Sequence, residues 1–193
     1  MITPIDVFRP CVWQGEFDFS QLNLNAKLES AVGELGDITM REVNFSTSSP
    51  EIQPHSWQEF SPFLSWVNDA VEEIWKQWDL VPLQRYITNS HVNKITAGKG
   101  LREHAHPGVD LVVTGYISVP EGAGNIEIRD PNEYQWQNLP INSHPSQVWK
   151  EIPIKTNTVL IFPGWLNHRT QPSITNDPRW VVTMMIRSRL AQG

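Results

Sequence analysis

The stretch HAHPGVDLVVTGYISVP, residues 104–120, decides the fold that we expect for this chain. Residues 111–119 are nearly all apolar or β-branched, which is typical of a central strand buried on both faces. The stretch begins with His104 and His106, which occupy alternate positions. Alternate side chains of an extended segment point to the same side, so both imidazoles can reach neighbouring positions on one metal ion. We therefore expect a metal site where the chain enters a strand-rich core.

A third ligand is expected from a distant part of the chain. His168 follows a predicted strand at 158–162 and a turn formed by Pro163 and Gly164. That turn can bring the chain back over the same end of the barrel as the histidine pair. Imidazole is a ligand for iron, zinc, copper and nickel alike, so the donor type does not choose the metal.

From residue 83 onward the pattern is one of short strands broken by glycine and proline. Such a pattern predicts an all-β barrel or sandwich. The predicted strands cover residues 83–95, 111–119, 125–129, 148–152, 158–162 and 180–187. Residues 132–147 are expected to form a loop, in the manner of a lid.

The first third of the chain is expected to be helical. One apolar series at helical spacing runs from Leu24 to Leu35 and stops at Gly36, a residue that favours helix ends. A second runs from Phe63 to Trp78, with Ser61 as its predicted cap and Pro62 at its first helical position. We expect both helices to pack outside the sheet. The prediction is one mainly β domain with flanking helices, in which residues 1–82 are the helical part and 83–190 the barrel core.

Composition limits the function classes. The chain has 193 residues and a net charge of −6, which argues against a protein that binds a phosphate backbone. It has no apolar run long enough for a membrane span and no expected secretory signal. The single cysteine, Cys11, is expected to be a plain buried residue. One cysteine allows no intrachain disulfide, so a cytoplasmic location is expected.

Three segments carry a family resemblance: HAHPGVDLVVTGYISVPEGAGNIEIRDP at 104–131, TNTVLIFPGWLNHRTQP at 156–172, and RWVVTMMIR at 179–187. In their order and spacing the region from residue 91 to residue 187 resembles the iron- and 2-oxoglutarate-dependent oxygenase superfamily, most closely a branch found in phages and marine bacteria. The resemblance implies a double-stranded β-helix, the jelly-roll barrel also seen in cupins. It implies iron(II) and 2-oxoglutarate as cofactors, molecular oxygen as co-substrate, and hydroxylation of a small molecule or peptide.

The resemblance also implies roles for single residues. His104 is the expected first metal ligand and His168 the distal one. Arg179, eleven residues later, is expected to bind the far carboxylate of 2-oxoglutarate, because a guanidinium offers two parallel hydrogen bonds to a carboxylate. Asn93 could hydrogen-bond the co-substrate or the substrate, or be a polar interior residue bonded to backbone.

The chain departs from the superfamily at one ligand. The usual motif has an aspartate or glutamate where this chain has His106. Either three histidines bind the metal or Asp110 takes the second position. We favour His106, because Asp110 lies at the start of an apolar strand. A site of three histidines would carry one negative charge less, and it could also serve dioxygenase chemistry without 2-oxoglutarate.

Two other functions stay open on the sequence. A cupin-like metal enzyme, either an isomerase or a cofactor-independent dioxygenase, would use the histidine pair, Asp110 and the residues around Gly164, but would leave Arg179 without a role. A binding module with a structural metal or none is the third interpretation. The oligomeric state is open, with a homodimer among the options.

Several further residues have lesser expected roles. We expect His91 to support the metal site from outside its ligand set and Trp165 to form part of the pocket wall. His55 and His144 are expected on the surface. The direction of Tyr116 is left open.

Overall fold

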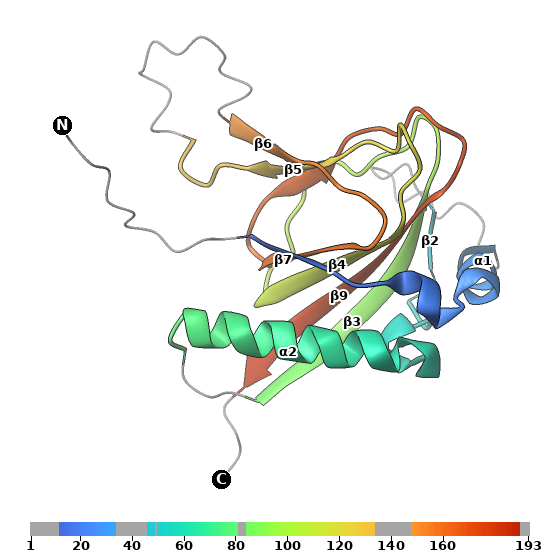
Figure 1. Cartoon of the computed structure of the whole chain (residues 1–193). Helices are drawn as coiled ribbons and strands as arrows, with labels where there is room; N and C mark the ends of the chain where they lie inside the picture. The colour runs from blue at the N-terminus through green and yellow to red at the C-terminus, as the bar shows by residue number, and fades with distance from the viewer. Residues whose placement is uncertain (1–11, 34–45, 49, 81–83, 134–147, 190–193) are drawn as a thin grey trace.

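The computed structural model describes residues 12–33, 46–48, 50–80, 84–133 and 148–189. These residues form two β-sheets and two α-helices (Figure 1). The helices are α1 (Asn25–Gly33) and α2 (Ser61–Gln77), and short 3₁₀ turns lie at Phe19–Leu22, Pro54–Ser56 and Gln58–Phe60. The strands are β1 (Trp13–Glu16), β2 (Ser46–Thr47), β3 (Gln84–Ile95), β4 (Leu111–Ser118), β5 (Ile126–Arg129), β6 (Trp149–Ile152), β7 (Thr158–Pro163), β8 (His168–Thr170) and β9 (Arg179–Arg189).

The strands pair into a large and a small sheet, both antiparallel. The large sheet has the order β1-β7-β4-β9-β3-β2 and the small one the order β6-β5-β8. Together they are the two walls of a double-stranded β-helix. The described strands form two separate sheets and do not close into one continuous barrel. An isolated bridge pairs His104, in the segment between β3 and β4, with His168 of β8.

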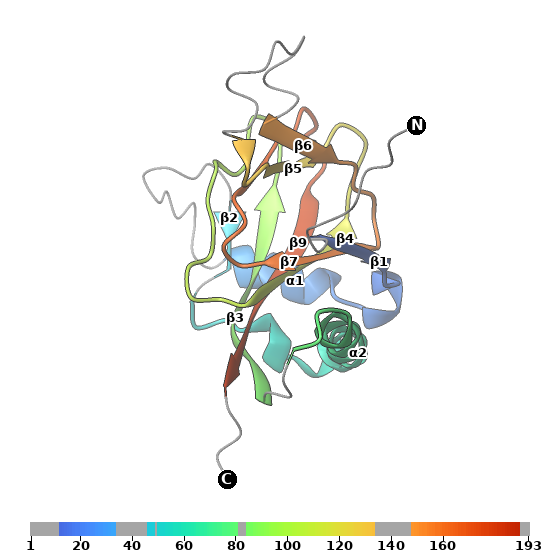
Figure 2. The same ribbon diagram turned by 90° about the vertical axis from the view of Figure 1, so that its left-hand side faces the viewer.

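Alternation along β4 divides the apolar residues between two cores. Leu111 and Val113 face a core that contains the buried side chains of α1 and α2, including Phe63. Val112 and Tyr116 face a second core, shared with β5, β7 and β9, which lies between the two sheets. Helix α2 runs across the outer face of the large sheet (Figures 1 and 2). One face of the large sheet is thus closed by helices, and the other is left to the small sheet and the pocket between them.

The predicted helices are found, with two differences. Helix α1 begins at Asn25, and the expected end at Leu35 and Gly36 lies outside the described residues. Ser61 was the wrong choice of cap for α2: it is itself the first helical residue, and Phe60 at the cap makes no side-chain capping bond. The reason is the 3₁₀ turn Gln58–Phe60, which runs directly into the helix and leaves no extended capping position. Pro62 accordingly lies second in the helix.

All six predicted strands are present, with bounds that differ by up to two residues where both ends are described. The sequence prediction missed β1, β2 and β8. Strands β2 and β8 have two and three residues, too few for alternation to be recognised in the sequence. Leu83, Cys11, His144 and most of the predicted loop at 132–147 lie outside the described residues. None of the helices in the described part has the length and hydrophobicity of a membrane span.

Candidate metal centre

The two histidine-bearing segments are joined by backbone hydrogen bonds. His104 and His168 exchange N–H···O bonds of 3.0 Å in both directions, and the His106 N–H donates to the Gly164 carbonyl at 2.7 Å. Gly164 has to be glycine, because a Cβ there would lie 2.3 Å from the Val109 carbonyl oxygen. The tight turn before His168 therefore brings His104 and His168 into register, although they lie 64 positions apart, since 168 − 104 = 64.

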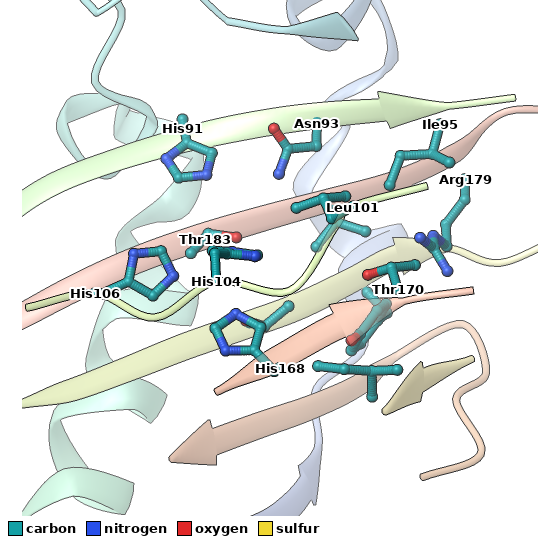
Figure 3. Close-up of a pocket in the computed structure, with 14 residues that line it drawn as sticks. His91, Asn93, Ile95, Leu101, His104, His106, His168, Thr170, Arg179 and Thr183 are labelled. Atoms are coloured by element: carbon teal, nitrogen blue, oxygen red, sulfur yellow. The ribbon is translucent and has the colours of Figure 1, made fainter. Parts of the chain in front are cut away.

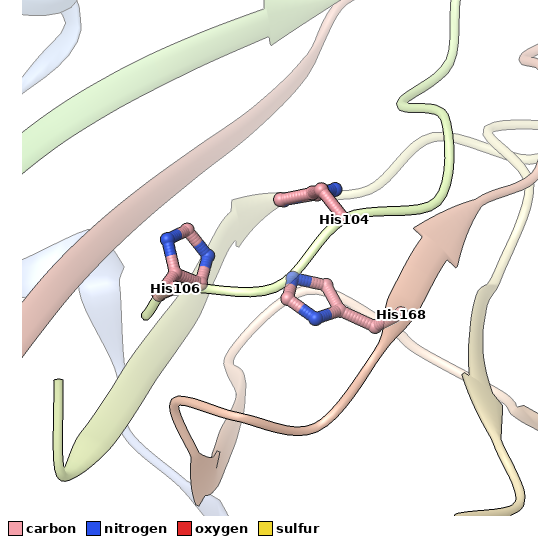
Figure 4. Close-up of side chains that lie close together, drawn as sticks. All are labelled: His104, His106 and His168. Carbon is pink, nitrogen blue, oxygen red and sulfur yellow. The ribbon is translucent and has the colours of Figure 1, made fainter. Parts of the chain in front are cut away.

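The three imidazoles converge on one point (Figure 4). Ring nitrogens of His104, His106 and His168 all lie within 4.8 Å of one another. The ring centroids are 4.2 Å apart for His104 and His168, and 5.2 and 5.3 Å apart for the two pairs that include His106. Such spacing fits three donors on one face of a cation and leaves other coordination positions open.

Backbone carbonyls orient two of the rings. Nδ1 of His104 lies 2.8 Å from the Arg102 carbonyl, and Nδ1 of His168 lies 2.9 Å from the Leu166 carbonyl. A carbonyl only accepts, so Nδ1–H is the donor in both bonds and Nε2 keeps its lone pair. Burial lowers the pKa of His106 to about 4 and of His168 to about 3, with the nearby imidazoles adding to the effect. Both rings are neutral at pH 7, as metal ligands must be.

Asp110 does not join this cluster. Its Oδ2 accepts hydrogen bonds from the backbone N–H and the hydroxyl of Ser188, at 2.5 and 2.6 Å. Of the two second ligands that the sequence allowed, the structure brings His106 to the other histidines.

A polar pocket opens beside the three rings, between the sheets (Figure 3). Its cavity volume is about 40 Å³. The side chains in its wall come from both sheets and from the loop before His104: His91, Asn93, Ile95, Leu101, His104, His106, Thr114, Tyr116, Ile126, His168, Thr170, Arg179, Val181 and Thr183.

Strand register arranges the large-sheet part of this wall in rows. His91, Thr183 and Thr114 are cross-strand neighbours on β3, β9 and β4 and form the row opposite the histidine cluster. The next row is Asn93, Val181 and Tyr116, and the last pairs Ile95 with Arg179. Because same-face residues on a strand lie about 7 Å apart, Arg179 is about two rows from the level of the metal ligands.

Arg179 lies at the end of the pocket away from the three histidines (Figure 3). It is 1% exposed, and its Nη1 donates to the carbonyls of Ala123 and Gly124 at 3.1 and 2.8 Å. Its Nε has no hydrogen-bond partner. Burial lowers the pKa of Arg179, and nearby Tyr116 partly opposes that shift, but a guanidinium stays protonated in proteins. A buried cation with an unused donor fits the carboxylate of a bound acid.

Asn93 and Tyr116 form the middle of the pocket. Asn93 is 4% exposed, and its Oδ1 lacks a hydrogen-bond partner. Asn93 thus lines the pocket, while its role toward a ligand stays a prediction. Burial raises the pKa of Tyr116, so the side chain is a neutral phenol that faces the pocket. The sequence analysis did not assign three residues of this wall to the site: Tyr116, Thr170 and Thr183. Strand alternation could have indicated two of them, because Thr170 lies two residues after His168 and Thr183 lies four residues after Arg179.

Three lesser predictions have different outcomes. His91 lines the pocket, and burial lowers its pKa to about 4. His55 is half-buried and not on the surface, because its Nδ1 lies 2.7 Å from the Ser90 hydroxyl. Trp165 was wrongly placed in the wall of the pocket: it is 55% exposed and borders a separate hollow next to Arg129 and Glu133.

One comparison with known protein families gives a match. A family model described as "Putative 2OG-Fe(II) oxygenase" matches residues 89–184. No curated protein is significantly similar to the chain in sequence.

Solved structures share the fold. A prolyl-4-hydroxylase of Pseudomonas putida has a TM-score of 0.66 at 14% identity, covering 92% of this chain and 92% of that one. A viral collagen prolyl hydroxylase from Paramecium Bursaria Chlorella virus-1, in its 2OG complex, has a TM-score of 0.59 at 13% identity over 93% and 97%. HygX from Streptomyces hygroscopicus, with nickel, 2-oxoglutarate and hygromycin B bound, has a TM-score of 0.59 at 12% identity over 91% and 81%.

Proposed function

This chain belongs to the family of 2-oxoglutarate- and iron(II)-dependent oxygenases, and from that membership we propose that His104, His106 and His168 hold the iron. The observation that carries this proposal is the convergence of three imidazole nitrogens within 4.8 Å at the wall of a buried polar pocket. The donors fit iron(II), which accepts imidazole readily, and two rings are already held with Nε2 available.

For 2-oxoglutarate we propose a site that runs from the histidines to Arg179. The free Nε and the protonated guanidinium of Arg179 would bind the far carboxylate, with the Tyr116 hydroxyl beside it. Asn93, between these two ends, offers its amide to the middle of the molecule. The unpartnered Nε favours this function over a cupin-like enzyme, which binds no 2-oxoglutarate. A buried donor without a partner costs free energy unless a ligand supplies a hydrogen-bond acceptor.

When bound, iron, 2-oxoglutarate and molecular oxygen would supply the oxidation, in which 2-oxoglutarate becomes succinate and carbon dioxide and the substrate gains one oxygen atom. The chain's own part is to position and enclose. Two backbone carbonyls fix the directions of His104 and His168, and Arg179 would anchor the co-substrate at the end of the pocket away from the histidines. The walls between the sheets keep bulk water away from the reacting atoms.

The substrate is a small molecule or a peptide, and we propose hydroxylation as the reaction. Support comes from the shared fold with two prolyl hydroxylases and with HygX bound to hygromycin B. Four further statements stay predictions: a single domain, a cytoplasmic location, a homodimer and the absence of a nucleic-acid partner. The net charge of −6 supports the prediction that the protein does not bind nucleic acid.

Calorimetry with and without the anchor residue tests this function. The iron-loaded protein under nitrogen should bind 2-oxoglutarate, and Arg179→Ala should lose at least about tenfold in affinity, since a charged hydrogen bond contributes about 1.5–3 kcal/mol. The variant should still bind iron. Loss of iron binding alone would indicate misfolding, and unchanged 2-oxoglutarate affinity would contradict the assigned site. Formation of succinate with iron, ascorbate and candidate substrates then measures turnover.

A further inference from the structure

The wall of the metal pocket carries an excess of positive charge. Of its fourteen residues none is an aspartate or glutamate, and Arg179 is the one permanently charged side chain. The three candidate ligands are imidazoles, which bind a metal in the neutral form. Within the described residues of this wall, nothing can offset a positive charge.

The carboxylates nearest in sequence to the histidines are engaged elsewhere. Glu103, next to His104, pairs with Arg129 at 2.5 Å. Asp110 accepts both of its short hydrogen bonds from Ser188. Neither lines the pocket, so neither takes the place of the acidic ligand that the sequence lacks at His106.

The charges can be counted, and the count rests on the proposed function. Iron(II) and Arg179 together contribute +3, and 2-oxoglutarate contributes −2. With an aspartate or glutamate at position 106 the total would be zero, whereas with His106 it is +1. An unpaired charge in a buried site is unfavourable, so the site favours a partner of opposite sign.

The side of the pocket that faces the histidines can receive such a partner. His91, Thr183 and Thr114 form a cross-strand row there, and none of their side chains hydrogen-bonds another described residue. A neutral imidazole and two hydroxyls can all donate hydrogen bonds, and no acidic group in the row would repel an anion.

We propose that the pocket binds a second anionic group beside 2-oxoglutarate, between His106 and the row of His91, Thr183 and Thr114. The group is a small monoanion, either a carboxylate carried by the substrate or a free anion from solution. The substrate class that follows from the first source is an organic acid or a peptide presenting an acidic side chain or terminus.

Acetate and acetamide provide a matched pair of probes, since they have nearly the same shape and differ in charge. The protein is loaded with cobalt(II), whose visible absorption reports its surroundings, and saturated with 2-oxoglutarate. Each probe is titrated at an ionic strength held constant with sodium perchlorate, a weak ligand. We expect acetate to bind at least tenfold more tightly than acetamide. Equal binding of the two, or binding of neither, would overturn the proposal.

Two variants locate the binding site. His106→Asp restores an acidic ligand and should lower acetate affinity at least tenfold while cobalt and 2-oxoglutarate still bind. Thr183→Val keeps the side-chain shape, removes one donor and should weaken acetate several-fold, which maintains the test if His106→Asp fails to fold. Parent-like acetate affinity in a folded Thr183→Val, or in a folded, cobalt-loaded His106→Asp, would count against the site.

A chloride titration separates the two sources. If chloride competes with acetate, the site binds a free anion from solution. If chloride does not affect acetate binding, the site is one for a carboxylate of the substrate. Failure of the parent protein to bind cobalt or 2-oxoglutarate at all would instead contradict the proposed function.

Discussion

Arg179 and His168 show what a single position has to satisfy in this site. Nη1 of Arg179 is held by two carbonyls, while its buried Nε has no hydrogen-bond partner. His168 is held by the Leu166 carbonyl at Nδ1 and packs against Phe162 with centroids 4.8 Å apart. In both cases the side chain is fixed on its far side, so its functional atoms are oriented before any ligand arrives.

Removal of one imidazole should therefore weaken metal binding strongly. His168→Ala is expected to reduce cobalt affinity at least about 100-fold, because even outer partners of metal ligands contribute 10- to 100-fold. Competition with a chromogenic chelator measures this. His55→Ala is the matched control, since His55 bonds Ser90 outside the cluster. Comparable losses in the two variants would mean that His168 is not a ligand.

The loop before β5 is the element that positions the anchor residue. Ala123 and Gly124 present their carbonyls to Arg179, and Gly124 lies in the left-handed region with φ +74°. A Cβ at Gly124 would lie 2.6 Å from the Gln171 carbonyl oxygen. The glycine is required both for its backbone angle and for close contact with the chain after β8.

Gly124→Ala should displace this loop and weaken 2-oxoglutarate binding several-fold without affecting metal affinity. Gly98→Ala is a matched control: Gly98 also has φ +74°, but a Cβ there meets nothing within 4 Å. Both variants introduce the same backbone strain, so a difference between them in calorimetry with 2-oxoglutarate reports the steric clash of the new Cβ at position 124. An equal effect of the two substitutions would show that the loop does not position Arg179.

At the scale of the whole molecule, helices on one side of the large sheet stabilise the wall that faces the pocket. Phe63 of α2 is fully buried and its ring lies 5.0 and 4.8 Å from those of Phe17 and Phe19. The helical core thus links the first strand, the long helix and the central strands of the large sheet.

Truncation in that core should cost stability in the entire domain. Phe63→Ala is expected to lower the free energy of unfolding by about 3–5 kcal/mol, as for other large aromatic residues in cores. Urea denaturation measures the loss. Asn68→Ala on the exposed face of the same helix should change it by no more than about 0.5 kcal/mol. A small change in the free energy of unfolding for Phe63→Ala would contradict the expectation that the chain unfolds as one cooperative domain.

The metal-free protein should also lose stability in mild acid. Burial lowers the pKa of His91 and His106 to about 4 and of His168 to about 3, below the 6.5 of an exposed histidine. The unfolded chain therefore binds more protons below pH 6.5, and stability falls as the pH is lowered toward 4. We expect the Tm to drop by at least about 3 °C between pH 7 and pH 5. His91→Asn should make this dependence shallower, and a Tm that rises in this range would contradict the burial of neutral imidazoles.

The sequence by itself determined the strand pattern, the histidine pair and the resemblance to the oxygenase family, because alternation and residue spacing are local properties. Strands β4, β7 and β9 follow from their apolar runs, and the sequence also indicates five candidate site residues: His104, His106, His168, Arg179 and Asn93. Only the tertiary structure decided that His106 rather than Asp110 faces the other histidines, that Tyr116 points into the pocket, and that Trp165 does not. Those outcomes depend on strand register and on hydrogen bonds between residues far apart in the chain, such as Asp110 with Ser188, and no local pattern encodes such contacts.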